Sequence, residues 1–314
     1  MKIKNTFLKF LNKHLRTCVI FNFHDIVADG SPVRIDQISV ATFRNQLNWI
    51  RQHFTILRID EFVERFANDR VELPLAAITF DDGYLAHYSL IKPILDEFGI
   101  KAAFYVSSTH LQHEYYWHDI VETYCQTAST QQQAQLRLEF NFLQTSHTTS
   151  LIESIKYLSL AERQLVISRI EESTKSLMSA RVLMNANELM SLADGGHLIG
   201  GHTLNHPILA LESEETCVHE ICDDLRALED LLKKKVITFA YPNGIPERDF
   251  TETHQQILSN YGVQYAVTTE KSVLRKPLNR LSIPRVNLFS ANDNLHCNYL
   301  LRVILKSVFR IFKE

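Results

Sequence analysis

The sequence predicts an α/β fold in which one barrel-like domain spans residues 1–314. Short apolar runs of strand length alternate with segments of helical periodicity from about residue 19 to 290, which is typical of parallel β/α units. The chain is 45% hydrophobic and 22% charged, an ordinary globular composition, and its length suffices for a single barrel. Because no linker, internal repeat or low-complexity segment interrupts the alternation, we expect a single domain.

The first part of the chain supplies strands and helices in turn. The apolar run CVIFNFHDI ends in polar residues, as a strand does when it leaves the core. The segment ATFRNQLNWIRQHF repeats apolar residues at helical spacing. A later helix stops at Gly99, a residue typical of helix ends. We expect strands at 18–26, 75–80 and 100–108, helices at 41–54 and 88–99, and a short strand followed by a helix within 54–66.

The middle of the chain breaks this rhythm. Residues 119–181 are rich in Gln, Thr, Ser, Leu and Glu with long helical patterns, which predicts a helical insertion between two barrel units. The alternation then resumes and continues to about residue 290. We expect helices at 185–196, 213–234 and 250–262, and strands at 197–202, 236–242, 263–269 and 281–288.

Both ends of the chain are basic, although the whole chain has a net charge of −3. Residues 1–20 carry five basic residues and no acidic one. Residues 295–313 predict an amphipathic helix with basic residues along one stripe and apolar residues on the other side. Two interpretations stay open: the apolar face docks on the domain, or the helix lies at an anionic membrane surface.

The remaining composition bears on the compartment. The five cysteines are irregularly spaced without a CxxC pair, which favours reduced thiols over disulfides or a structural zinc site. No apolar run approaches a membrane span, and the basic N-terminal segment lacks the apolar core of a secretory signal. We therefore expect a cytoplasmic protein, peripheral at the inner face of the membrane if its termini bind lipid. A nucleic-acid partner is not expected at this net charge.

Two motifs carry chemistry. Asp81 and Asp82 stand side by side at the end of the buried strand 75–80, where two carboxylates ionise only if something positive is near. His202 and His206 are four residues apart, so both imidazoles can reach one ion. An aspartate and two histidines leave positions open for water and substrate, as in catalytic divalent metal sites. Taken singly, the motifs also fit a surface turn and core histidines. Their shared place at strand ends favours an active site.

Several segments resemble a known family. TFDDG at 79–83 and HTLNHP at 202–207 resemble the first two motifs of the NodB-like polysaccharide deacetylases, carbohydrate esterase family four, and FAYPNG at 239–244 resembles a third. NFHDI, YWHDIVE and IPRVNL also stand where one branch of that family has similar segments. The resemblance covers about residues 19–290. It implies a distorted (β/α) barrel of the NodB-homology type and a metal-dependent hydrolase that removes acetyl groups from N-acylated sugars.

The resemblance also implies roles for particular residues. Asp82, His202 and His206 would hold the metal, with Zn²⁺ first among several divalent ions that this ligand set suits. Asp81 would be the general base that takes a proton from the attacking water. The backbone N–H of Asn243 would stabilise the developing oxyanion.

The sequence departs from the family pattern in two places. Ala240 stands where the third motif has an arginine that steadies the catalytic aspartate, and we expect Arg285 to supply that charge unless it only forms a surface salt bridge. The C-terminal Leu-x-His motif that supplies the general acid is missing. His24 is our candidate acid, oriented by Asp25, with a buried structural histidine as the alternative. Aromatic residues at the start of the insertion, Tyr116 and Trp117, are candidates for stacking on sugar rings or for the core.

The function predicted is N-deacetylation of an N-acylated sugar or glycan in surface-glycan or lipid-linked glycan synthesis. Two alternatives remain. One is an amidase of a small cytosolic amide, which would need no membrane attraction. The other is a non-catalytic glycan-binding protein on the same fold, against which the complete set of metal-ligand residues counts.

Overall fold

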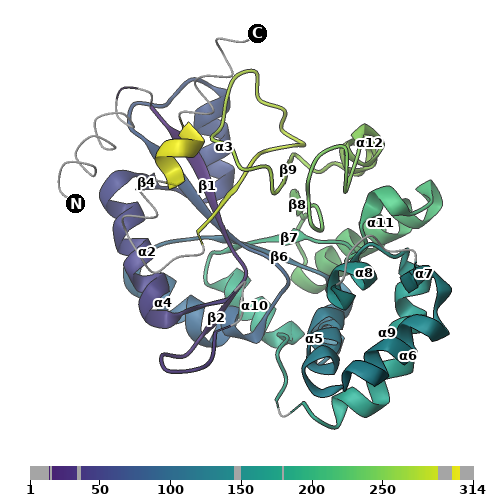
Figure 1. Ribbon diagram of the computed structural model, residues 1–314. Coiled ribbons are helices and arrows are strands. Elements are labelled where there is room, and N and C mark those ends of the chain that lie inside the picture. Colours follow the sequence, from purple (N-terminus) through teal and green to yellow (C-terminus); the bar gives the residue numbers. More distant parts are fainter. Residues whose placement is uncertain are drawn as a thin grey trace.

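Figure 1 shows a computed structural model of the chain, which describes residues 14, 16–33, 37–144, 150–178, 180–288 and 299–304. A curled sheet of parallel strands forms its centre, and helices pack around it, as the α/β prediction requires. The prediction of a distorted (β/α) barrel is confirmed.

The main sheet has the strand order β10-β1-β5-β6-β7-β8-β9, with β4 paired to β5. Every strand pair in it is parallel. Strands buried on both faces are continuously apolar, which explains why the strand runs show no alternation. The strands are β1 (Cys18–Phe23), β4 (Thr55–Ile56), β5 (Leu75–Phe80), β6 (Ala103–Val106), β7 (Leu198–Gly201), β8 (Thr238–Ala240), β9 (Tyr265–Val267) and β10 (Val286–Asn287).

One short segment links the two edges of this sheet. Ile283 forms a parallel bridge with Val267 of β9, and Val286 pairs with Phe21 of β1. Only two residues of the strand expected at 281–288 therefore form a named strand, because the segment passes from one edge strand to the other. Arg285 lies inside this linking segment, with its side chain fully buried.

The expected strand 18–26 is divided at His24. Its second part, β2 (Asp25–Val27), leaves the main sheet and pairs with β3 (Gln37–Ser39) in a small parallel sheet. The break sets His24 at the carboxyl end of β1, beside the carboxyl end of β5.

Helices with one apolar face cover the sheet. In α2, for example, Phe43, Leu47 and Ile50 are buried, and Ser39 caps the first turn. Gly99 ends α4 in the left-handed conformation, with a φ of 66°. The covering helices are α2 (Val40–His53), α3 (Ile59–Ala67), the π-helical η1 (His87–Ile91) that runs into α4 (Lys92–Phe98), α10 (Ala186–Asp194), α11 (Glu214–Leu232) and α12 (Glu252–Tyr261), with short 3₁₀ turns η2 (Ser108–Gln112) and η3 (Leu209–Leu211).

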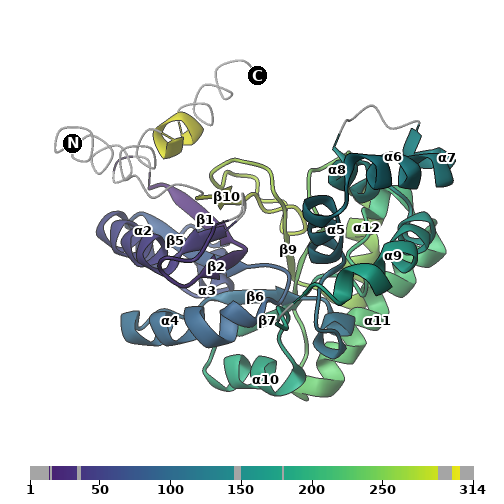
Figure 2. The ribbon, with the colours of Figure 1, turned by 60° about the horizontal axis from the view of Figure 1, so that its bottom comes forward.

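In the predicted insertion at 119–181, the structure has several consecutive helices between β6 and β7. They are α5 (Trp117–Thr127), α6 (Thr130–Glu139), α7 (Asn141–Gln144), α8 (Leu151–Lys156) and α9 (Leu160–Lys175). They enclose an apolar cluster of their own, separate from the barrel core. Figure 2 shows them gathered beside α11, on one side of the sheet.

The predicted C-terminal helix at 295–313 lies mostly outside the described residues, as does the basic segment 1–13. Residues 299–304 are helical, and Leu300, Val303 and Ile304 are buried against the barrel core. In this described turn the apolar side docks on the domain, which is the first of the two interpretations. Among the described residues, no helix is both long and apolar enough to cross a membrane. The four cysteines in the described residues, Cys18, Cys125, Cys217 and Cys222, are free thiols.

Burial of His87 predicts acid sensitivity of the fold. Burial lowers the pKa of His87 from 6.5 to about 4, and its Nε2 bonds to the His24 carbonyl oxygen at 2.7 Å. The folded state keeps the ring neutral, whereas the unfolded state binds a proton below pH 6.5. The free energy of unfolding is therefore highest above pH 6.5 and decreases as the pH falls toward 4. We expect the unfolding free energy to drop by about 2 kcal/mol at pH 5 from this group. Urea denaturation at pH 7.5 and pH 5 measures it. His87→Gln keeps a donor without titrating and should reduce the drop; an unchanged drop would contradict the assignment.

Candidate active site

The candidate residues meet at the carboxyl ends of the barrel strands. Asp81 and Asp82 follow β5, His202 follows β7, and Asn243 stands in the loop after β8. Together with His24 and His206, they line one cavity of about 360 Å³. The structure thus brings together these six of the seven site residues expected from the sequence, and the seventh, Arg285, is buried behind Asp81.

Asp82, His202 and His206 form a compact buried cluster. The Asp82 Oδ1 atom lies 3.4 Å from His202 Nε2 and 3.5 Å from His206 Nε2. Asp82 and His206 hold left-handed backbone conformations, with φ of 78° and 54°. Non-glycine residues adopt this region at a cost, so the tight turns persist because the surrounding structure enforces them.

The donor set fits a divalent cation. Ligand atoms about 2.1 Å from a tetrahedral ion lie about 3.4 Å apart, which matches the spacings to Asp82 Oδ1. His202 Nδ1 bonds to the Ala240 carbonyl at 2.7 Å, so Nε2 is the nitrogen that faces the cluster. Such outer bonds fix the tautomer of metal-binding histidines. Among the described residues, this is the group of acidic, histidine or cysteine side chains that can hold an ion.

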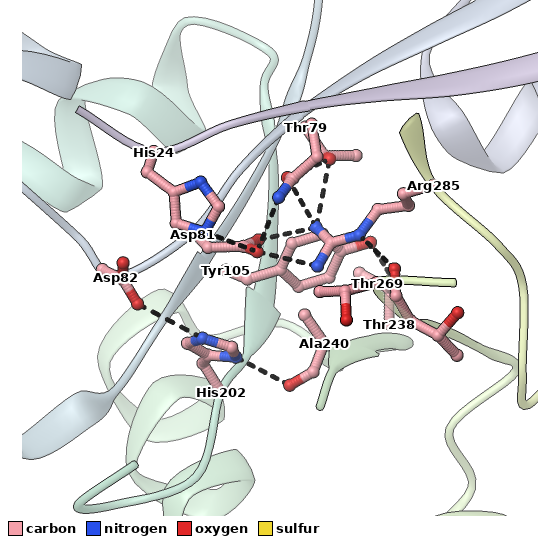
Figure 3. Close-up of polar contacts among 12 residues, drawn as sticks. His24, Thr79, Asp81, Asp82, Tyr105, His202, Thr238, Ala240, Thr269 and Arg285 are labelled. Carbon is pink, nitrogen blue, oxygen red and sulfur yellow. Dashed lines mark hydrogen bonds and ion pairs between the residues drawn. The ribbon is translucent and has the colours of Figure 1, made fainter. Parts of the chain in front are cut away.

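Arg285 holds Asp81 through two parallel charge-assisted hydrogen bonds, as Figure 3 shows. Nη1 donates to Oδ1 and Nη2 to Oδ2, each at 2.7 Å, and the Asn22 amide donates to Oδ2 at 3.0 Å. Arg285 therefore does not form a surface salt bridge, the alternative considered for it. Burial would raise the pKa of Asp81, but the Arg285 charge and hydrogen bonds outweigh it and hold the pKa below its ordinary value.

Arg285 is itself fully engaged. Its Nε donates to the Thr268 carbonyl at 2.9 Å, and Nη1 also donates to Asn22 Oδ1 at 2.7 Å. The guanidinium lies 5.6 Å from the Tyr105 ring centroid. The arginine comes from the segment linking β9 to β1, so it reaches Asp81 from a different part of the barrel than Ala240 of β8, the position at which we expected the missing arginine.

His24 reaches the same carboxylate. Its Nε2 atom lies 4.0 Å from Asp81 Oδ2, and its side chain is 23% exposed, so it borders the cavity. The expectation that Asp25 orients it is wrong. Asp25 accepts a bond from Gln37 at 2.6 Å, whereas His24 Nδ1 has no hydrogen-bond partner among the described residues. Successive side chains of an extended segment point to opposite sides, which carries Asp25 away.

Asn243 lines the cavity from the loop after β8. It has a φ of 57°, and its carbonyl accepts a hydrogen bond from the Thr269 hydroxyl. Within the described part of the chain, its own N–H has no acceptor. A backbone N–H without an acceptor, in a residue that lines the cavity, is free to donate to a developing oxyanion.

Aromatic side chains from the start of the insertion form one wall of the cavity. Tyr116 is only 4% exposed and meets the His206 ring edge-to-face at 5.3 Å. It is thus a core residue that also supports a ligand of the cluster. Trp117 is half-buried and lines the same cavity, which leaves it available for stacking on a sugar ring.

Sequence reasoning missed three residues that shape the site. Asn22, whose amide donates to Asp81, was detectable as a polar residue within the apolar strand β1. Asp224 lies on the buried face of α11, where its two oxygens accept the backbone N–H groups of Ser108 at 2.7 Å and His202 at 2.9 Å. It thereby ties the ends of β6 and β7 together. Its place among apolar residues of the helix was the available signal.

The third missed residue, Arg163 of α9 in the insertion, supports the loop that carries Asn205 and His206. Its side chain is buried, and it donates to the carbonyls of Asn205 at 2.5 Å and His206 at 2.9 Å. It also lies over the Trp117 ring at 4.7 Å. On the opposite side, Glu220 of α11 accepts the Asn205 backbone N–H at 2.8 Å. No sequence pattern pointed to Arg163, because an arginine in a polar helix is ordinary.

Removing this support should weaken ion binding. We expect Arg163→Met to lower the Zn²⁺ affinity about 10–100-fold, because outer contacts of ligand loops have effects of that size. Competition with a chromophoric chelator measures it. Arg169→Met, on the same helix but exposed, is the matched control. An Arg163→Met protein that is folded by circular dichroism and binds Zn²⁺ like the parent would contradict the role.

Comparisons with known proteins identify a family and several similar folds. The family model for polysaccharide deacetylase matches residues 69–266. The fold is similar to a Streptococcus pyogenes deacetylase, PplD, in complex with acetate (TM-score 0.60, 18% identity, 91% of this chain and 97% of that one). It is also similar to IcaB from Ammonifex degensii (TM-score 0.60, 19% identity, 91% and 96%) and to a de-N-acetylase from Aggregatibacter actinomycetemcomitans (TM-score 0.59, 14% identity, 90% and 99%). Among curated proteins, none matches this sequence significantly.

The distorted parallel barrel carries a carboxylate held by an arginine beside an Asp–His–His cluster, both at the carboxyl ends of its strands. The family match covers well over half of the chain, so the chain belongs to the polysaccharide deacetylase family. It is accordingly a hydrolase of the N-deacetylase class that acts on carbohydrates. The resemblance stated from the sequence motifs is confirmed.

Proposed function

We propose that this protein is a metal-dependent N-deacetylase, which hydrolyses the acetamide of an N-acetylated sugar to acetate and a free amine. The observation that carries the proposal is the pairing of two differently held carboxylates in one cavity. Asp81 is fixed by Arg285, whereas Asp82 faces His202 and His206.

Asp82, His202 and His206 are the residues that would hold the ion. When bound, a divalent ion such as Zn²⁺ polarises the amide carbonyl and makes water a nucleophile near neutral pH. Asp81 accepts a proton from the attacking water. Its lowered pKa keeps it ionised and ready at neutral pH, and Arg285 and Asn22 hold it in place.

The remaining steps use donors on the other sides of the cavity. The water oxygen bonds to the acyl carbon, and the carbonyl oxygen gains negative charge that the Asn243 N–H stabilises. His24, acting as the general acid, donates a proton to the amide nitrogen as the C–N bond breaks. The products are acetate and the amine. This role requires His24 to carry a proton on Nε2, which faces the cavity.

We assign the activity to surface-glycan or lipid-linked glycan synthesis, at the inner face of the cytoplasmic membrane. The basic ends of the chain support this setting, since they favour an anionic surface. The free thiols of the described cysteines agree with a reducing compartment.

The test is acetate release from N-acetylated sugars, both free and linked to polyprenyl phosphate. The protein is stripped with a chelator, assayed, reloaded with Zn²⁺ and assayed again. We expect release only after reloading, with one free amine formed per acetate. Release that persists in the stripped protein would contradict metal dependence. A reloaded protein that binds Zn²⁺ but releases acetate from none of these sugars, and instead hydrolyses a small ureide, would replace the proposal by the amidase alternative.

A further inference from the structure

We propose that the mouth of the catalytic cavity binds a phosphate group carried by the substrate. The inference rests on the proposed function, which supplies the N-acetylated sugar. It adds that this sugar is attached to a phosphate or diphosphate. The residues concerned are Lys156, Arg248 and Lys271, which we call the cationic mouth.

These three cations come from separate elements and converge on one cavity. Lys156 ends α8 of the insertion, Arg248 stands in the loop after β8, and Lys271 stands in the loop after β9. All three line the cavity that Asp82 and His202 also line. A substrate whose acetamide lies at the cluster therefore has the cationic mouth on its way out to solvent.

Arg248 is positioned in advance. The fully buried Asp249 accepts bonds from its Nε at 2.8 Å and Nη2 at 3.1 Å, and Asp249 is itself held by the Ile245 backbone N–H at 2.9 Å. The Arg248 side chain remains 49% exposed, and its Nη1 has no partner among the described residues. Because Asp249 holds Arg248 through Nε and Nη2, the Nη1 donors stay available to an anionic oxygen of a ligand.

Lys156 and Arg248 share one aromatic ring. Lys156 Nζ lies 5.7 Å and Arg248 Cζ 5.4 Å from the ring centroid of Tyr157. Two cations near one ring are close enough to repel each other, and a bound anion lowers that repulsion. The ring thus brings together charges from the insertion and from the barrel.

Carboxylates do not cancel this charge. Glu153 approaches Lys156 at 3.8 Å, with its side chain 48% exposed. The buried Asp249 carboxylate balances the charge of Arg248. Lys271 forms no ion pair within the described residues. The three cations therefore have two carboxylate partners among the described residues, which leaves one positive charge in excess within the cationic mouth. Asp81 and Asp82 also line the cavity, but they belong to the active site, and the excess positive charge of the cationic mouth attracts anionic ligands.

The chemistry favours phosphate over a neutral glycan. A guanidinium with free donors and two ammonium groups is the set that binds phosphate oxygens with charge-assisted hydrogen bonds. A neutral sugar would gain little from these charges. Both a lipid carrier and a soluble nucleotide present a diphosphate next to the sugar, and this shared group is the one that the cationic mouth recognises.

The first experiment measures binding without turnover. Inorganic diphosphate is titrated calorimetrically into the metal-free protein, so that only side chains can bind it. We expect binding by the parent, at least about tenfold weaker binding by Lys156→Ala/Lys271→Ala, and weakening with added salt. Lys101→Ala is the matched control, because Lys101 precedes β6 at the opposite end of the strands. Absent binding, or equal binding by parent and double variant, would overturn the inference.

The second experiment measures kcat/KM on N-acetylglucosamine as its methyl glycoside, its 1-phosphate, its uridine diphosphate and its polyprenyl diphosphate. We expect the phosphate-bearing compounds to exceed the methyl glycoside at least about tenfold, and the double variant to lower that ratio. Preference for the uridine or the polyprenyl compound identifies the soluble or the lipid source. Equal rates on all four would overturn the inference and leave the proposed function standing. Turnover of none would count against the proposed function, and the diphosphate titration would still decide the inference.

Discussion

Asp81→Asn is expected to lower kcat/KM for acetate release about 10²–10⁴-fold, the range typical of a lost general base. The amide cannot accept the proton of the attacking water, although its shape still fits between Arg285 and Asn22. Asp81 does not belong to the Asp–His–His cluster, so we expect Zn²⁺ affinity to change little. Steady-state kinetics and a chelator competition measure the two quantities.

Asp223→Asn is the matched control for this substitution, because Asp223 is an exposed aspartate of α11 that pairs with Arg226. It should keep the parent's kinetics. If Asp81→Asn retained more than about a tenth of the activity, a general-base role would not hold. If it instead lost Zn²⁺ binding, Asp81 would be part of the ion site.

Arg285→Met is expected to lower the unfolding free energy by about 3–5 kcal/mol, because removing one partner leaves the buried Asp81 carboxylate uncompensated. Both residues are nearly inaccessible, at 0% and 2% exposure. Activity should fall as well, since Asp81 loses its orientation. Urea denaturation gives the stability, and Arg280→Met, which breaks an exposed pair with Glu64, should cost little.

The double variant Asp81→Asn/Arg285→Met separates the two roles of this pair. Without either charge, the buried site no longer carries an unpaired ion, so we expect stability to return toward the parent value relative to Arg285→Met alone. Activity should stay as low as in Asp81→Asn. A double variant as unstable as the sum of the single variants would show that the two residues are not energetically coupled.

Some residues of the site could be predicted from the sequence, and others could not. Asp81 and Asp82 are adjacent, and His202 and His206 share one turn, so their spacing alone indicated a common site at strand ends. The family motifs then named their roles. Arg285 was expected from a missing arginine in the third motif, and the structure shows its two bonds to Asp81. The role predicted for Asp25 was wrong, because adjacent side chains of an extended chain point to opposite sides, so Asp25 does not face His24.

The local pattern of the chain was enough to predict the class of fold, most strands and helices, and the identity of the cluster residues, because periodicity and short motifs are local properties. Contacts between distant segments were decided only by the tertiary structure. Arg285 meets Asp81 across 204 positions, and Arg163 supports the His206 loop across 43. Such partners follow from barrel closure and from how the helices of the insertion pack, and neither leaves a signal in the neighbouring residues. The same holds for the cationic mouth, whose three members come from three separate elements.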